Sequence, residues 1–217
     1  MEQAQILSRG WYLATDRSTG ARLACEEFSV LKKAGTIVVQ ARQTTLGRPE
    51  AEQASTFWLD ADWTPRRLIA AVGETAVMAN FTEEETVVVA ADESGTEKGR
   101  FAIPRRDVYF ALEGGLYFPL LLVQRFDFAS PFTQTFRGVP GGSCQLRRLE
   151  DQVVRGERFR VLEVHFDHPN SSDTLELYVR EDGELDHYIA SNLDCVVQLS
   201  SHYRLSDDFQ NDSLTVH

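Results

Sequence analysis

Apolar and polar residues alternate along most of this chain. In the clearest segment, Leu175, Leu177 and Val179 are separated by more polar neighbours, and Val, Ile, Thr and aromatic residues are frequent in the other alternating segments. A period of two is typical of β-strands that bury one face, because successive side chains of a strand point to opposite sides. The pattern therefore predicts a mainly β protein.

Short turn motifs separate the alternating segments, for example at residues 33–35 (KAG) and 181–183 (EDG). Strands joined by so few residues must pair antiparallel, since a parallel pair needs a crossover connection of about a dozen residues or more. We therefore expect an antiparallel meander of about ten to twelve strands, from fourteen alternating segments of which some merge. One of these segments spans residues 144–154.

One segment departs from this alternation. Residues 113–128 read EGGLYFPLLLVQRFDF, in which Pro119 suits the first turn of a helix and residues 120–123 are all apolar. A short helix that is apolar on every side must be buried. We expect a strongly curved antiparallel meander, a half-barrel, that encloses a short apolar helix near residues 116–127.

The length of 217 residues is compatible with one domain, because all-β sandwiches and barrels often reach this size. We expect residues 1–205 to form a single β half-barrel domain. Residues 206–217 are polar and aperiodic, and they predict a frayed tail.

The order of features resembles a known family. A meander is followed by the helix around FPLLLVQRF, then by a second meander with a strand at residues 158–167 and the hairpin LELYVREDGELDHYIA. This order resembles bacterial proteins with a LolA/LolB-like fold, the half-barrel of periplasmic lipoprotein carriers. The resemblance implies a hollow that holds an acyl chain or another apolar molecule beside a helix. A similar half-barrel also occurs in an enzyme of violacein biosynthesis, so the resemblance leaves an enzyme open.

Charge and composition narrow the possible partners. The chain carries 33 acidic and 22 basic residues, a net charge of −11, which disfavours nucleic-acid binding. The longest apolar run, residues 116–123, is far shorter than the ~20 residues of a membrane-spanning helix. The first residues lack a secretion signal, which predicts a cytoplasmic location, or export if a native signal has been removed.

The three cysteines are far apart and lack metal-ligand spacing, so we expect reduced core thiols and neither a metal nor a cofactor. Glu163, His165 and Asp167 share one face of a predicted strand, where they either meet solvent or gather around a metal or a proton. His187 alternates with Leu185 and Ile189, which favours a hydrogen-bonded core histidine over a ligand contact. Because no nucleophile motif is present, we assign no catalytic residue.

A group of aromatic and apolar residues lies in the first-half hairpin and the predicted helix. These side chains either pack in the core or line an apolar pocket. The candidates for ligand binding are Trp58, Trp63, Tyr117, Phe118, Leu121, Leu122 and Phe126.

We expect the protein to bind an apolar or lipid-like small molecule in the concave face of its sheet. Two alternatives remain from the sequence. One is an enzyme with acid/base chemistry from His165, Asp167 or His187, and the other is a scaffold that forms a homodimer.

Overall fold

The computed structural model describes residues 4–104, 115–130, 132–137, 143–168, 171–191 and 193–204, which form fifteen strands and one helix. The first eight strands are β1 (Gln5–Asp16), β2 (Arg22–Lys33), β3 (Thr36–Thr45), β4 (Arg48–Leu59), β5 (Pro65–Val72), β6 (Thr75–Phe81), β7 (Glu85–Asp92) and β8 (Glu97–Pro104). Helix α1 (Phe118–Arg125) follows. The remaining strands are β9 (Gln134–Arg137), β10 (Ser143–Arg148), β11 (Gln152–Val154), β12 (Glu157–His168), β13 (Ser171–Val179), β14 (Leu185–Ala190) and β15 (Cys195–Arg204).

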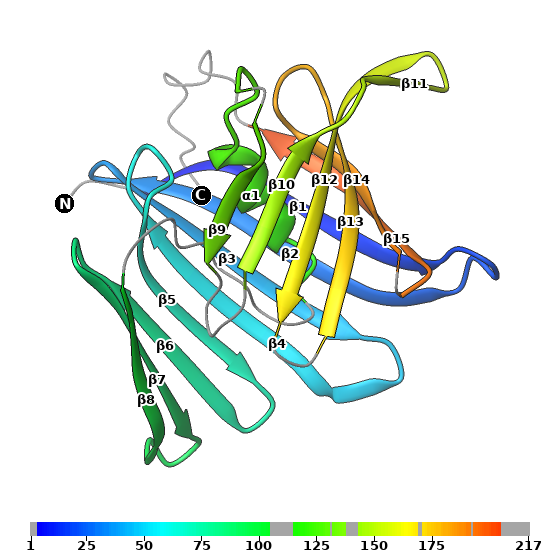
Figure 1. The fold of residues 1–217 in the computed structure, drawn as a ribbon. Helices are drawn as coiled ribbons and strands as arrows, with labels where there is room; N and C mark the ends of the chain where they lie inside the picture. Colours follow the sequence, from blue (N-terminus) through cyan, green and yellow to red (C-terminus); the bar gives the residue numbers. More distant parts are fainter. Residues whose placement is uncertain are drawn as a thin grey trace, which may run out of the picture.

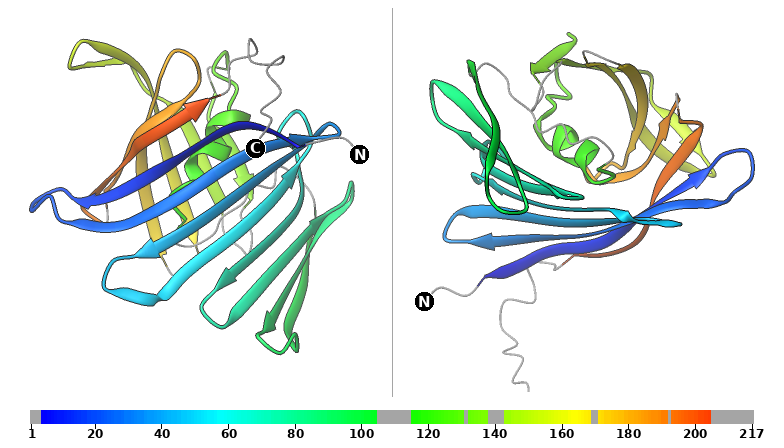
Figure 2. Two further views of the ribbon diagram at one scale, coloured as in Figure 1. Left: turned by 180° about the vertical axis from the view of Figure 1, so that it is seen from behind. Right: turned by 90° about the horizontal axis from the view of Figure 1, so that it is seen from below.

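All fifteen strands belong to one antiparallel sheet that does not close into a barrel. The strand order is β8-β7-β6-β5-β4-β3-β2-β1-β15-β14-β13-β12-β10-β9, and β11 pairs with β12 beside this path. The two meanders are joined where β1 pairs with β15. The sheet curls around α1, which lies in its hollow between the β5–β8 side and the β9–β15 side (Figures 1 and 2). The prediction of a curved antiparallel meander around a short apolar helix is confirmed.

The predicted number of strands was too low. The expected segments do not merge, because short turns separate them, and the expected strand at 144–154 divides into β10 and β11. The β2–β3 loop shows how tight these turns are: Ala34 and Gly35 both have positive φ, at 48° and 79°. Positive φ at both residues of a two-residue hairpin loop gives the turn the same twist as the flanking strands.

The main core lies between the inner face of the sheet and α1. Period-two alternation places one side of each strand in this core, as in β2, where Ala24, Phe28 and Val30 are buried. Helix residues 118–123 are all buried, so α1 contributes apolar surface on every side. A smaller cluster of Phe159, Val161 and Tyr178 covers the other face of β12 and β13.

The described helix is far shorter than a membrane-spanning helix would be. The cysteines are unpaired, with Cys144 and Cys195 buried and Cys25 half-buried. The frayed tail predicted for residues 206–217 lies outside the described residues.

Candidate functional site

A carboxyl group lies in the middle of the inner face. Glu26 occupies a position in β2 that would ordinarily be apolar, because it alternates with the buried Ala24 and Phe28. The residue is 4% exposed. A charged side chain is rarely buried to this extent unless it is paired.

The partners of Glu26 are backbone groups at the start of α1. The N–H of Tyr117 donates to Oε2 of Glu26 at 2.7 Å, and the N–H of Leu116 donates to the same carboxyl group. No Lys, Arg or His pairs with this carboxyl among the described residues. Burial outweighs the two N–H donors and raises the pKa of Glu26 to about 7.

Polar side chains of neighbouring elements surround Glu26. Tyr12 of β1 and Gln43 of β3 pair directly with Glu26 in the antiparallel register, so all three project from the inner face. Tyr117 lies against Phe28, with ring centroids 4.7 Å apart, and its ring is 6.3 Å from that of Tyr12.

Tyr188 of β14 completes the group from the second meander. Its hydroxyl donates to the carbonyl oxygen of Leu116 at 3.2 Å, while the hydroxyl of Tyr12 donates to the carbonyl oxygen of Leu185 at 3.1 Å. Leu116 is thus bonded to Glu26 through its N–H and to Tyr188 through its carbonyl. We call Glu26, Gln43, Tyr12, Tyr117 and Tyr188 the inner polar cluster.

Two atoms of the inner polar cluster have no hydrogen-bond partner among the described residues. They are Oε1 of Gln43, whose residue is 6% exposed, and the hydroxyl of Tyr117, whose residue is 1% exposed. Elsewhere, the same is true of Oγ1 of Thr86 and Nε of Arg160. Since native proteins pair the large majority of their buried polar groups, the two atoms beside Glu26 mark this place as unusual.

The three phenols of the cluster are held neutral. Burial, followed by the negative charges of Glu184 and Glu26, raises the pKa of Tyr12 far above its ordinary value. Burial is also the main cause that raises the pKa values of Tyr117 and Tyr188, and Glu26 adds to both. The surroundings of the cluster therefore oppose additional negative charge.

The structure brings together six of the seven ligand-binding residues predicted from the sequence. Tyr117, Phe118, Leu121, Leu122 and Phe126 are buried in the main core, and Trp63 packs against it. Trp63 reaches this position from the β4–β5 turn, where its φ is 65°.

Trp58 does not join the other six. Its neighbours Phe57 and Leu59 are buried on the inner face, so Trp58 points to the outer face of β4. There the guanidinium group of Arg67 lies 5.5 Å from the centroid of its ring.

The row formed by Glu163, His165 and Asp167 lies on the outer face of β12. Glu163 is ion-paired with Arg147 at 2.7 Å, and Nδ1 of His165 lies 3.2 Å from Oγ1 of Thr174. His165 and Asp167 are exposed. Within the described ranges, no three potential ligands are close enough to hold a metal ion.

His187 lies on the opposite face of the sheet from Leu185, although simple alternation predicts that the two share a face. The register shifts between Tyr178 and Val179, so His187 lies on the outer face, stacked on Tyr178 at 4.2 Å, while Leu185 faces the core. Nδ1 of His187 lies 2.8 Å from Oδ2 of Asp186, which also pairs with Arg180.

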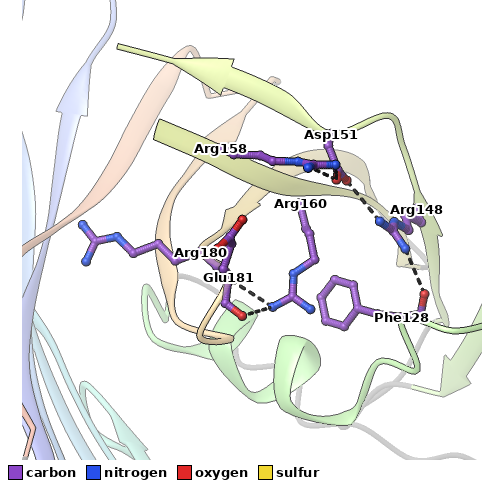
Figure 3. Close-up of polar contacts among 7 residues, drawn as sticks. All are labelled: Phe128, Arg148, Asp151, Arg158, Arg160, Arg180 and Glu181. Carbon is purple, nitrogen blue, oxygen red and sulfur yellow. Dashed lines mark hydrogen bonds and ion pairs between the residues drawn. The ribbon is translucent and has the colours of Figure 1, made fainter. Parts of the chain in front are cut away.

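Arginines gather near the segment that follows α1 (Figure 3). Asp151 pairs with Arg148 at 3.1 Å and with Arg158 at 2.8 Å. Arg160 lies over the ring of Phe128, with its guanidinium carbon 4.2 Å from the ring centroid, and donates to the carbonyl oxygens of residues 180 and 181 at 2.9 and 3.0 Å. These contacts fasten the β13–β14 turn to β12 and to the segment after the helix.

A groove of about 330 Å³ lies on the outer face across β2, β3 and β4. The polar residues that line it are Glu27, Ser29, Gln40, Arg42, Ser55 and Thr56. Glu27 pairs with Arg9 and Arg42 pairs with Glu52, so the charges of this groove are balanced by neighbours.

Sequence reasoning missed Glu26, Gln43, Tyr12 and Tyr188. A usable indication exists for Glu26, because the alternation Ala24, Glu26, Phe28, Val30 places a carboxylate in a run of core positions. The contribution of Gln43 depends on strand register, and that of Tyr188 depends on how the two meanders curl around α1.

Comparison of the chain with protein-family models and with curated protein sequences finds no match.

Proposed function

We propose that the protein binds an apolar, lipid-like small molecule between the inner face of the sheet and α1. The side chains that face this region are mostly apolar, both on the two β meanders and on every side of the helix. Sites for small molecules are mostly apolar, with a few polar groups that fix the orientation of the ligand. The inner polar cluster supplies such groups.

The observation that carries the proposal is the pair of buried, unpartnered atoms on Gln43 and Tyr117. An unpaired polar atom in an apolar interior costs about 1–3 kcal/mol, and a ligand that pairs with it recovers this cost on binding. The resemblance to lipoprotein carriers, whose half-barrel holds an acyl chain, supports the same function.

Entry of a ligand requires movement, because the cluster is enclosed in the present conformation. The start of α1 is held by the carboxyl group of Glu26 and by the hydroxyl of Tyr188. Displacement of this end of the helix opens the hollow without breaking any strand pairing, since α1 is not part of the sheet.

The first experiment is native mass spectrometry of the gently purified protein, followed by titration with the uncharged fluorescent probe N-phenyl-1-naphthylamine. We expect either a bound small molecule or saturable uptake of the probe. Leu121→Phe, which enlarges the helix within the hollow, should weaken uptake severalfold, whereas Trp58→Phe on the outer face should leave it unchanged. A protein without bound small molecules that also takes up no probe would refute the proposed function.

A further inference from the structure

The polar atoms that face the hollow are mainly hydrogen-bond acceptors. The carboxyl group of Glu26 has no cationic partner among the described residues, and the amide oxygen of Gln43, directly opposite in the register, has no donor. A carboxylate and an amide oxygen both accept hydrogen bonds. Glu26 and Oε1 of Gln43 therefore offer acceptors to a ligand.

Two tyrosines beside Glu26 add acceptors only. A phenol carries a single hydroxyl proton. Tyr12 uses its proton on the carbonyl oxygen of Leu185, and Tyr188 uses its proton on that of Leu116. Tyr117 alone in the cluster retains a hydroxyl proton without a partner in the described part of the chain.

Among the described residues, no positive charge offsets this surplus of acceptors. Arg180 is near enough to influence Tyr12, but its guanidinium group is ion-paired with Glu184 and Asp186. An anionic group placed in the cluster would meet Glu26 and several lone pairs, with no free cation in the described part of the chain, which is costly in a buried site.

We infer that the ligand is an amphiphile whose polar end donates hydrogen bonds through a primary amine or a hydroxyl group, and that carboxylate, phosphate and sulfate amphiphiles are rejected. The polar end pairs with Glu26 and with Oε1 of Gln43 beneath the start of α1, and the apolar tail follows the helix along the inner face. This inference rests on the proposed function and adds the chemical class of the ligand.

Three probes with the same tail test the ligand class: decylamine, 1-decanol and decanoate. Each is used below its critical micelle concentration at about pH 8, and its affinity is measured by displacement of N-phenyl-1-naphthylamine. We expect the amine and the alcohol to bind at least about tenfold more tightly than the carboxylate, since one unpaired buried group changes affinity by about this factor.

Two substitutions connect the preference to the cluster. Glu26→Gln removes the negative charge and should reduce the preference for decylamine over decanoate by about tenfold. Gln43→Leu removes the acceptor and should weaken binding of 1-decanol, while Gln40→Leu, on the exposed outer face of the same strand, should leave all three affinities unchanged. Circular dichroism checks that each variant is folded, and Gln43→Leu keeps the test decisive if Glu26→Gln does not fold.

The outcomes separate the inference from the function on which it rests. If no probe binds and N-phenyl-1-naphthylamine is not taken up, the proposed function itself fails. If all three bind equally, or decanoate binds most tightly, a ligand site remains and the assignment of its chemical class is wrong.

Discussion

The buried carboxyl group of Glu26 makes the stability of the fold depend on pH near neutrality. Its pKa is about 7 in the folded protein, against 4.5 for an ordinary glutamate. Between these two values the folded state binds a proton that the unfolded state releases, so the free energy of unfolding falls as the pH rises. Below about pH 4.5, Glu26 is protonated in both the folded and the unfolded state, so it does not lower the free energy of unfolding.

The size of the effect follows from the difference between the two pKa values. At about 1.4 kcal/mol per pH unit, the full cost of ionising Glu26 in the folded protein is about 3 kcal/mol. Between about pH 5 and about pH 8, roughly 2–3 kcal/mol of this cost is expressed. No cation facing Glu26 opposes the trend, because its described neighbours are Tyr12, Gln43, Tyr117 and Tyr188.

Urea denaturation, followed by tryptophan fluorescence across this pH range, measures the effect. The wild-type protein should lose roughly 2–3 kcal/mol relative to Glu26→Gln as the pH rises, since glutamine cannot ionise. Glu27→Gln is the matched control, because Glu27 is the adjacent residue but lies on the outer face, paired with Arg9. This variant should follow the wild type. Parallel pH profiles for the wild type and Glu26→Gln would refute the reasoning.

Three further substitutions test the packing and the polar contacts by denaturant unfolding. Leu122 is 2% exposed, so Leu122→Ala leaves a cavity and should lower the free energy of unfolding by about 2–5 kcal/mol. Leu46 is 51% exposed, so the control Leu46→Ala should change it by less than about 0.5 kcal/mol. Equal effects would contradict the placement of α1 in the core. Arg160→Met removes two hydrogen bonds to the β13–β14 turn and should cost roughly 1–3 kcal/mol; a stable variant with an unchanged turn in NMR spectra would show that these bonds do not fasten it. Asp186→Asn should cost about 1–2 kcal/mol at neutral pH, since Arg180 is partly exposed. Because His187 and then Arg180 lower the pKa of Asp186, this cost should shrink as the pH falls below about 4, and a cost that is constant with pH would argue against the pairing.

Much of the fold could be predicted from the sequence because its features are local. Period-two alternation identifies each strand, short loops require antiparallel neighbours, and a helix apolar on every side must lie in the hollow of the sheet. The separation of β10 from β11 was missed because the intervening residues continue a polar segment without a glycine or proline.

The site was harder to predict because it depends on which face each residue occupies. Trp58 was grouped with Trp63 by closeness in sequence, although alternation with Phe57 and Leu59 places it on the outer face. His187 was placed by alternation with Leu185, but the register shift between Tyr178 and Val179 moves it to the other side. A bulge inserts one residue in the strand and so reverses the pattern beyond it.

A crystal structure of the protein grown with decylamine tests the central claim most directly. The account predicts the alkyl chain along α1 on the inner face, with the amine within hydrogen-bond distance of Glu26 or Gln43 and the start of the helix displaced. An alkyl chain in the outer groove beside Gln40 and Arg42, with the inner polar cluster unchanged, would contradict it.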